Sequence, residues 1–479
     1  MVFRITLSDR QHLEVPAGTN LLEALRQAGC FLDAPCGGRG TCGKCKVTVN
    51  GKEVCACQTV VDRDMAVALP KSGDSSILTS GIPVSSGSGT GYRLAFDIGT
   101  TTVAGFLLDG SGTELACESR ENPQRAYGAD VISRIQYALR NDGEIQTKVI
   151  RDCLARMSAA LCQKLGVEEN RIQTVSIAGN PAMQQLFLGI SPENLARIPF
   201  APVLTEMRKV PAKDYLPCLQ NADLLIVPDI SGFVGADTVA CMLAIELGVQ
   251  EDWTLLVDIG TNGEMVLGNR ERMVACSTAA GPALEGANIS CGMRGRPGAI
   301  DHVWVDNGAL CYSVIGDTEA EGICGSGLID AAAAALELGW INFRGRVQTE
   351  DRCIHLTDRV TLTQDDIRQL QLAKGAVAAG IRLMAEYLGI ELEEIHKVCL
   401  AGAFGSFMDP VSACRIGLLP QELAGKTVAV GNAAGSGAKL LACEESAAAK
   451  VAQLLEKTVF LELGSLPDFQ FCFAENMRF

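Results

Sequence analysis

The sequence predicts a small N-terminal α+β domain followed by a larger, duplicated α/β domain with two lobes. Three observations lead to this prediction. Six of the 20 cysteines lie between residues 30 and 57, a Ser/Gly-rich segment covers residues 71–91, and three motifs beyond residue 92 occur twice in the same order. With 479 residues, the chain is long enough for two or three domains.

Residues 1–70 have the pattern of a hairpin, a helix, a cysteine-rich loop and a second hairpin. VFRITLS and HLEVPAG alternate like paired strands, and TNLLEALRQAG has the spacing of an amphipathic helix with Thr19 placed as its N-cap. The dipeptide Asn50-Gly51 is a strong signal for a two-residue hairpin turn. This order predicts a β-grasp, ferredoxin-like domain that ends near Pro70.

The glycine-rich loop before the second hairpin has the cysteine spacing of an iron–sulfur site. Its cysteines follow the pattern C-x5-C-x2-C, and the hairpin brings a further thiolate back to them. A phosphate loop is disfavoured because Cys45 stands where Ser or Thr would bind Mg²⁺. Structural zinc prefers two Cys-x2-Cys pairs, and this region has one. We therefore predict a [2Fe–2S] cluster bound by Cys36, Cys42, Cys45 and either Cys55 or Cys57.

The choice of the fourth ligand rests on a resemblance. Cys55 and Cys57 share a face of an alternating strand, so periodicity does not separate them. The twelve-residue step from Cys45 to Cys57 is similar to the hairpin in the iron–sulfur subunits of fumarate reductases, where the last cysteine also follows Ala. This resemblance favours Cys57.

Composition limits the classes of partner and location. The formal net charge of −15 argues against nucleic acid or an anionic membrane as partner. The N-terminus MVFRITLSDRQ lacks the features of a targeting peptide, and no apolar run approaches the length of a membrane span. The other 14 cysteines are scattered singly, as buried small apolar residues would be. We expect a cytoplasmic protein in a reducing compartment, and we take an anaerobic source as a hypothesis.

Beyond the Ser/Gly-rich segment, which we interpret as a flexible linker, the chain repeats itself. The repeats predict two lobes, residues 92–247 and 248–479, that face each other across a cleft. Each lobe starts with a β-hairpin and continues through long helices such as 131–165 and 365–388. The paired motifs are LAFDIGTTTVAGFLLD (94–109) with LLVDIGTNGEMVLGN (255–269), VSIAGN (175–180) with VCLAGAFG (398–405), and LIVPDISGFVGAD (225–237) with VAVGNAAGSGAKL (428–440).

The two Asp-Ile-Gly-Thr turns are the candidate phosphate and metal sites. In each turn an apolar strand delivers a carboxylate, Asp97 or Asp258, and Gly and hydroxyl residues follow. Backbone N–H groups and hydroxyls in such a turn can face phosphate oxygens, and two carboxylates can hold Mg²⁺ through water. An ordinary strand-to-turn transition is the alternative for a single copy, but not for two copies in register. The candidate phosphate-binding residues are Gly99, Thr100, Thr101, Gly260, Thr261, Asn262 and Gly263.

This pattern resembles the superfamily of acetate and sugar kinases, heat-shock cognate proteins and actin (ASKHA), with its ribonuclease H-like lobes, over residues 92–479. The resemblance identifies AGAFGS at 401–406 as the adenosine motif. It also makes GICGSGLID at 322–330 a glycine turn with either ligand contact or a plain helix start. Lys374 is either a nucleotide contact or a solvated surface lysine. The residues implied for nucleotide binding here are Gly325, Ser326, Lys374, Gly402, Ala403 and Gly405.

The join of a [2Fe–2S] domain to an ATPase core is more specific than either part. It resembles the reductive activators of corrinoid-dependent methyltransferases, in which a separate middle domain can stand between linker and ATPase. Here the linker runs straight into the ATPase core, so the sequence predicts no such middle domain. The further matching motifs are YGADVISRI (127–135), AGNPAM (178–183), GFVGAD (232–237), AAGPALEGANISCGMRG (279–295) and AGAFGSFMD (401–409).

The resemblance implies an activity, its cofactors and its partners. An inactive Co(II) corrinoid on a partner protein would be reduced to Co(I) by one electron from the cluster, with Mg²⁺ and ATP hydrolysis supplying the driving force. An external low-potential donor such as a ferredoxin or flavodoxin would reload the cluster, and the ATPase domain would form a homodimer. The four histidines show no ligand spacing, so we expect the cobalt centre on the partner. Candidates to orient the attacking water, with no order among them, are Glu264, Asp237 and Asp130.

Two other functions remain as alternatives. A small-molecule kinase with a redox-sensing domain would phosphorylate a metabolite, although no sugar-binding pattern is legible in the sequence. An activator of an iron–sulfur dehydratase would hold a shared [4Fe–4S] cluster at a dimer interface, and Cys324 in GICGSG is the residue that keeps this alternative open. A buried structural cysteine is the other interpretation of Cys324.

Overall fold

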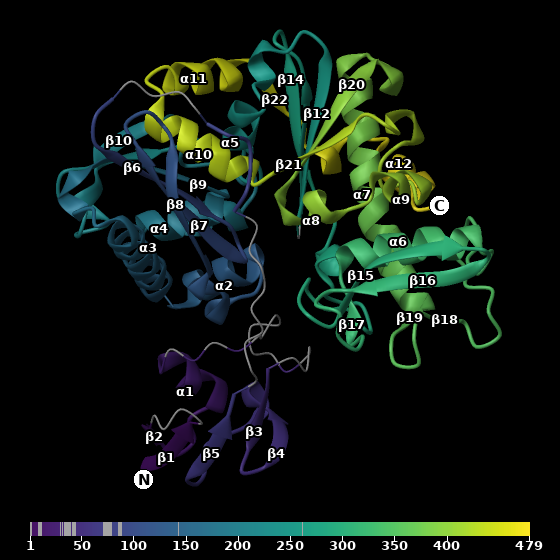
Figure 1. Ribbon diagram of the computed structural model, residues 1–479, viewed down its shortest axis with the longest axis horizontal. Coiled ribbons are helices and arrows are strands. Elements are labelled where there is room, and N and C mark those ends of the chain that lie inside the picture. The colour runs from purple at the N-terminus through teal and green to yellow at the C-terminus, as the bar shows by residue number, and fades with distance from the viewer. Residues whose placement is uncertain are drawn as a thin grey trace.

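The structure is a computed structural model that describes residues 2–7, 12–28, 30, 32, 40, 45–69, 79–84, 89–141, 143–260 and 262–479. A small N-terminal domain lies below two larger lobes in Figure 1. The predicted fold class, a ferredoxin-like α+β domain followed by a duplicated α/β domain, is confirmed. The predicted site residues Cys36, Cys42 and Thr261 lie outside the described residues.

The N-terminal domain is a mixed five-stranded sheet covered by one helix. Its strand order is β2-β1-β5-β3-β4, and Leu21 and Leu25 of the helix share a buried core with Ile5 of the sheet. Asn50 and Gly51 turn the second hairpin with φ values of 49° and 85°, as their sequence predicts. The elements are β1 Val2–Leu7, β2 His12–Pro16, α1 Leu21–Gln27, β3 Lys46–Val49, β4 Lys52–Cys55 and β5 Met65–Ala68.

The N-cap of α1 differs from the prediction. Asn20, not Thr19, caps the helix, because its side chain accepts a hydrogen bond from the backbone N–H of Leu22 at 3.1 Å. The Thr19 hydroxyl instead donates to the carbonyl of Pro16 at 2.7 Å. The Thr19 hydroxyl therefore bonds within the turn after β2 and does not cap α1.

The two lobes share the topology of five strands and differ in one edge strand each, β10 in lobe I and β22 in lobe II. Lobe I (92–247) has the order β10-β11-β9-β6-β7-β8, and lobe II (248–479) has the order β21-β20-β12-β13-β14-β22. In each, an antiparallel three-strand meander is followed by a strand parallel to its first member, β9 beside β6 and β20 beside β12. The repeated motifs therefore occupy equivalent strands in the two lobes, as the sequence predicts.

In chain order, the helices and strands of the two lobes have the following bounds. Lobe I consists of β6 Tyr92–Ile98, β7 Thr102–Asp109, β8 Glu114–Glu121, α2 Val131–Asn141, α3 Glu144–Leu165, β9 Ile172–Gly179, α4 Pro181–Leu188, β10 Arg208–Pro211, β11 Asp223–Ile226 and α5 Ala236–Ala244. The central strands and first helices of lobe II are β12 Trp253–Ile259, β13 Gly263–Gly268, β14 Met273–Thr278, β20 Ile395–Ala401, α8 Gly402–Phe407, α9 Pro410–Arg415 and β21 Thr427–Gly431. Its C-terminal elements are α10 Ala433–Cys443, α11 Ala447–Lys457, β22 Thr458–Phe460 and α12 Phe469–Asn476.

An insertion in lobe II separates β14 from β20. In it the helix α6 packs on the strand β15, and the long helix α7 leads back to the central sheet. Its elements are β15 Ala299–Asp306, β16 Ala309–Val314, β17 Gly322–Ile323, α6 Gly325–Glu337, β18 Cys353–His355, β19 Thr361–Thr363 and α7 Gln364–Leu388.

The helix predicted over 131–165 is two helices. Gly143 separates α2 from α3 and adopts the left-handed conformation with φ 67°, which ends one helix and starts the next. The helix predicted over 365–388 is confirmed as α7.

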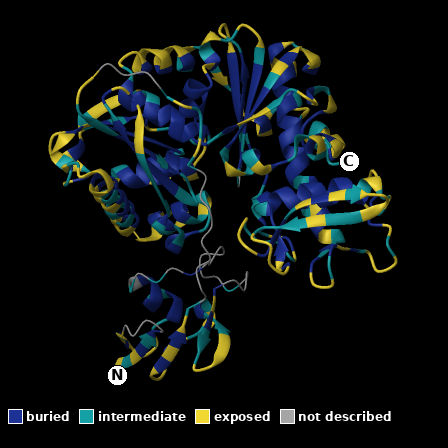
Figure 2. Ribbon diagram, in the orientation of Figure 1, coloured by how far each residue is buried: buried dark blue, intermediate teal, exposed yellow. Residues whose placement is uncertain are grey.

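One helix of each lobe, α5 of lobe I and α10 of lobe II, crosses to the other lobe. Helix α10 of lobe II contacts β6 and β9 of lobe I, while α5 of lobe I joins a core that includes Leu256 and Val266 of lobe II. The two helices touch closely, since a Cβ added to Gly437 would lie 2.0 Å from the carbonyl oxygen of Ala240. The buried residues of both lobes thus meet at their junction, which Figure 2 shows in dark blue.

Part of the predicted linker is hydrogen-bonded to lobe II. The backbone N–H of Asn432 donates to the carbonyl of Ser80 at 2.9 Å, and Gly81 forms an isolated bridge with Gly431. Within the described ranges, no helix is long and apolar enough to cross a membrane.

Candidate functional site

Four acidic side chains lie together where the two lobes meet. Asp97 is the second-last residue of β6 and Asp258 that of β12, and these strands are equivalent in the two lobes. Asp237 lies in the first turn of α5, and Glu264 is the residue of β13 that pairs with Asp258. The duplicated hairpins therefore bring one carboxylate from each lobe within electrostatic range of the other.

These carboxylates act on one another electrostatically. Burial raises the pKa of Asp97 to about 7, and the charges of Asp237 and Asp258 add to the rise. Burial together with the charge of Asp237 raises the pKa of Asp258 to about 7, and burial raises that of Asp237 to about 6. Burial, Asp237 and Asp258 together raise the pKa of Glu264 well above its usual value. Such a group favours a bound cation, which would lower all four pKa values.

The donor set suits an ion held through water. Among the described residues, no three His, Cys, Asp or Glu side chains are close enough together to bind a metal ion directly. Mg²⁺ usually keeps several of its waters and contacts only one or two carboxylates. Asp97 and Asp258 could therefore hold a hydrated Mg²⁺ between the lobes.

Polar side chains from three elements hold the first Asp-Ile-Gly-Thr turn. Asn122, after β8, donates its amide to the carbonyl of Gly99 at 2.7 Å. Asn180, the N-cap of α4, donates to the Thr100 hydroxyl at 3.0 Å, and the buried guanidinium of Arg134 on α2 donates to the Thr100 carbonyl. The carbonyls of Gly99 and Thr100 thus have partners within lobe I, which fix the conformation of the turn.

Two contacts join the lobes across this turn. Asn432, before α10, donates its side-chain amide to Asp97 at 3.1 Å. Arg294 of lobe II pairs with Glu121 of lobe I at 3.6 Å, next to Asn122. A change in the separation of the lobes would therefore alter both of these contacts beside the first turn.

The second turn is formed by different neighbours. The N–H of Gly260 donates to the carbonyl of Asn262 at 2.8 Å, and the carboxylate of Glu285 lies 3.5 Å from where a side chain on Gly260 would begin. Gly263 packs against the Thr278 hydroxyl, which would lie 2.9 Å from an added Cβ. Of the two glycines, Gly263 is thus the one whose backbone is closely approached.

The predicted adenosine motif begins beside the second carboxylate. A Cβ on Gly402, which has φ 75°, would lie 2.7 Å from Asp258 Oδ1, so this position requires glycine. Ala403 is exposed and Gly405 packs against the backbone of Leu400. The motif therefore runs from the carboxylate cluster to the surface.

The glycine turn before α6 meets the adenosine motif. An added Cβ on Gly325 would lie 2.9 Å from the ring of Phe404, so two predicted nucleotide segments come together. The Ser326 hydroxyl is buried and donates to the carbonyl of Asp301 at 2.9 Å, which fixes the start of α6. Cys324 is also buried, with its thiol 3.4 Å from the carbonyl of Ile300, as expected for a structural cysteine.

Lys374 is neither a surface lysine nor part of the carboxylate cluster. Its side chain is buried, donates to the carbonyl of Arg478, and lies 5.3 Å from the centre of the Phe479 ring. Burial lowers its pKa to about 7. The sequence could not predict this, because the covering residues lie about 100 positions further along the chain. Asp130 in turn caps α2 by accepting from the N–H of Ser133 at 2.7 Å.

The structure describes three of the candidate cluster ligands, Cys45, Cys55 and Cys57. The N–H of Cys57 approaches Sγ of the buried Cys45 at 3.5 Å, the type of contact that stabilises a cluster thiolate. Asn20 donates to the carbonyl of Cys57 at 2.9 Å, so the helix cap also fixes this residue. Cys55 instead lies opposite Lys46 in the β3–β4 ladder.

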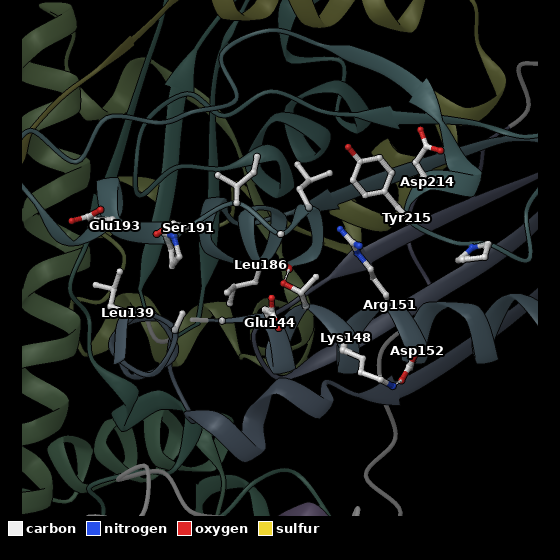
Figure 3. A pocket seen from close by; sticks show the side chains of 18 of the residues that line it. Leu139, Glu144, Lys148, Arg151, Asp152, Leu186, Ser191, Glu193, Asp214 and Tyr215 are labelled. Carbon is white, nitrogen blue, oxygen red and sulfur yellow. Dashed lines mark hydrogen bonds and ion pairs between the residues drawn. The ribbon is translucent and has the colours of Figure 1, made fainter. Parts of the chain in front are cut away.

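A hollow of about 1020 Å³ lies elsewhere in lobe I, between α2, α3 and the end of α4. Figure 3 shows Arg151 pointing toward Tyr215 across it. Positive and negative side chains alternate around it, including the ion pair of Lys148 with Asp152 at 2.6 Å. None of the predicted site residues lines this hollow.

The residues that hold the turns were not predicted. Four of them lie within quoted motifs, so a signal existed, but it did not indicate a role: Arg134 in YGADVISRI, Asn180 in AGNPAM, Glu285 in AAGPALEGANISCGMRG and Asn432 in VAVGNAAGSGAKL. Asn122 lies outside these motifs, because its contact comes from tertiary structure.

Comparison with protein families assigns three regions of the chain. Residues 5–69 match the family of 2Fe-2S iron-sulfur cluster binding domains. Residues 92–250 match the family described as the RACo middle region, and residues 252–479 match the C-terminal domain of RACo, the ASKHA domain. The middle region of that family thus corresponds to lobe I of this chain, which begins directly after the Ser/Gly-rich segment.

Individual proteins give the same result. The chain is 35% identical to the corrinoid activation enzyme RamQ of Eubacterium limosum, over 81% of this chain and 70% of that protein. It is 28% identical to the [Co(II) methylated amine-specific corrinoid protein] reductase of Methanosarcina barkeri, over 76% and 72% of the two chains. A solved reductive activator for corrinoid, iron-sulfur protein covers 99% of this chain and 98% of its own, with 28% identity and a TM-score of 0.71. The chain therefore belongs to the RACo family of reductive activators of corrinoid proteins.

Proposed function

We propose that this protein uses ATP to drive one electron from its [2Fe–2S] domain to the Co(II) corrinoid of a partner protein. The corrinoid is reduced to Co(I), the state that accepts a methyl group, and an external low-potential donor such as a ferredoxin or flavodoxin restores the electron. The observation that carries this proposal is the union, in one chain, of a 2Fe-2S domain with a two-lobed cleft that joins coupled carboxylates.

A difference in reduction potential explains why ATP would be needed. Clusters of this type have potentials near about −400 mV, and the Co(I) couple is expected to lie lower. Each further ~59 mV uphill lowers the equilibrium constant of a one-electron transfer tenfold. A nucleotide that changes the affinity of the activator for its partner can offset this deficit through coupling free energy.

The cleft residues have distinct roles in this proposal. Asp97 and Asp258 hold hydrated Mg²⁺, and the hydroxyls and N–H groups of both turns contact the phosphates. Asp237 and Glu264 are the candidates to orient the attacking water, because Asp237 acts electrostatically on both Asp97 and Asp258, and Asp258 acts on Glu264. The adenosine lies against the segment that begins at Gly402.

In this proposal, contacts between the two lobes couple nucleotide binding to movement of the lobes. Asn432 and Arg294 of lobe II contact Asp97 and Glu121 of lobe I, so phosphates bound between the turns would pull directly on both lobes. Closure of such lobes around a nucleotide is a hinge motion of the kind that changes distant surfaces.

The test is anaerobic and spectroscopic. The Ti(III)-reduced protein is mixed with a methyltransferase corrinoid protein in the Co(II) state, Mg-ATP is added, and the visible spectrum is followed. We expect Co(I) to form only with ATP, and not with the variants Cys45→Ser or Asp258→Ala. Persistence of Co(II) with several corrinoid proteins, while ATP is hydrolysed, would contradict the proposal and favour the dehydratase-activator or kinase alternative.

A further inference from the structure

The guanidinium of Arg134 is a buried cation whose hydrogen-bond partners are all neutral. Its side chain is fully buried. It donates to the carbonyl of Gly128 at 2.9 Å, to the carbonyl of Thr100, and to the thioether of Met183 at 3.0 Å. A buried charge without a paired carboxylate is costly, and arginine is the residue that can hold several acceptors in one plane.

The electrostatics of the surroundings agree with this geometry. Burial and the charge of Arg125 together lower the pKa of Arg134 to about 9, and the charge of Asp130 opposes them in part. The guanidinium thus lies inside lobe I without a hydrogen-bonded carboxylate and in direct contact with the first turn.

The position of the contact points to the compensating anion. Thr100 follows Gly99, the first residue after β6, and its hydroxyl accepts from Asn180 at 3.0 Å. Arg134 holds the Thr100 carbonyl, and we expect the N–H groups of the turn to contact the phosphates. A carbonyl that accepts a hydrogen bond from a cation polarises its peptide group. The N–H of that peptide group then becomes a stronger hydrogen-bond donor.

We infer that Arg134 is a positioning residue for the phosphates of the nucleotide: it fixes the Thr100 carbonyl and supplies a buried positive charge that an anion at the first turn compensates. This inference rests on the proposed function, because it deepens the nucleotide site of that proposal. Arg134 does not touch the ligand and acts through Thr100. Its effect on binding should therefore grow with the number of phosphates.

Lobe I contains a matched control. Arg151 on α3 is also an arginine that donates to a backbone carbonyl, that of Phe187 at 2.8 Å, and burial lowers its pKa as well. It stacks over the rings of Phe187 and Tyr215 and lines the hollow in Figure 3. Arg151→Met thus removes a comparable cation that has no contact with either turn.

The experiment measures the binding of Mg-ATP, Mg-ADP and adenosine to the full-length protein by calorimetry. We expect Arg134→Met to weaken ATP binding about tenfold or more, the range for a lost charge-assisted hydrogen bond. ADP binding should weaken less and adenosine binding should not change. Arg151→Met should leave all three affinities unchanged. Thermal unfolding without ligand reports any general loss of stability in either variant.

The measured affinities distinguish a failure of this inference from a failure of the proposed function. Equal losses for all three ligands, or no loss in a folded Arg134→Met protein, would overturn the inference and leave the proposed function standing. If Arg134→Met does not fold, Arg134→Lys takes its place, because one ammonium group cannot hold both carbonyls; it should show the same order of losses at smaller size. A wild-type protein that binds neither ATP nor ADP would overturn the inference together with the ATP dependence of the proposed function.

Discussion

Asn432 of lobe II donates a hydrogen bond to the Asp97 carboxylate of lobe I at 3.1 Å. The same side chain accepts from the N–H of Gly435 at 2.6 Å and so caps α10. One residue therefore ties the start of the helix that crosses between the lobes to the carboxylate of the first turn. The hydrogen bond lowers the pKa of Asp97 against the effect of burial.

Loss of this hydrogen bond should shift the pH dependence of ATP hydrolysis. In Asn432→Ser the hydroxyl still caps α10 but is too short to reach Asp97, so the pKa of Asp97 should rise further above about 7. Less of the ionised carboxylate would then be present at neutral pH. We expect kcat to fall several-fold at pH 7 and to recover as the pH is raised. An unchanged pH profile would show that Asp97 ionisation does not limit the reaction.

Lys374 predicts a rise in stability with pH. Its pKa is about 7 in the folded protein and about 10.4 when unfolded, so between these values the unfolded chain binds the extra proton. The free energy of unfolding should therefore increase with pH across this range, by up to about 1.4 kcal/mol per unit. Urea unfolding at several pH values measures the slope. Lys374→Met should lack this component, whereas the exposed control Lys213→Met should keep it.

The fourth cluster ligand can be decided by paired variants. Cys57 contacts Cys45 through its N–H, whereas Cys55 lies in the β3–β4 ladder. We expect Cys45→Ser and Cys57→Ser to lose iron and the visible absorption of the cluster, and Cys55→Ser to retain both at two iron atoms per cluster. Loss of iron in Cys55→Ser with retention in Cys57→Ser would reverse the assignment.

A methyl group added at the contact between α5 and α10 should lower the stability of the protein. Gly→Ala within a helix usually stabilises by about 1 kcal/mol. In Gly437→Ala the new carbon would lie 2.0 Å from the carbonyl oxygen of Ala240, so α5 and α10 must move apart. We expect a lower melting temperature, measured by calorimetry. A melting temperature equal to or above that of the wild type would show that the lobes separate there at little cost.

The sequence predicts the repeated strands because each carries its own local signal. The Asp-Ile-Gly-Thr turns follow apolar strands and precede glycine, so the positions of Asp97 and Asp258 could be read without tertiary information. Lys374 and Arg134 could not be read in this way. Only the packing of distant segments shows that Lys374 is covered by the C-terminal residues and that Arg134 reaches the first turn.

Local signals also failed where two of them competed. Thr19 and Asn20 are both good N-caps, and the choice depends on the turn after β2, which takes the Thr19 hydroxyl. The helical pattern on both sides of Gly143 is continuous, and the left-handed conformation of this glycine divides it. In both places the chain direction set by neighbouring elements outweighs the propensity of single residues.

The crossing of α5 and α10 has a consequence for synthesis of the chain. Residues 433–443 are needed to cover β6 and β9, although these strands leave the ribosome more than 250 residues earlier. Lobe I should therefore emerge with one apolar sheet face open and remain a client of chaperones until translation is nearly complete. A nascent chain halted before α10 would be expected to expose that face to proteases and to other unfinished chains.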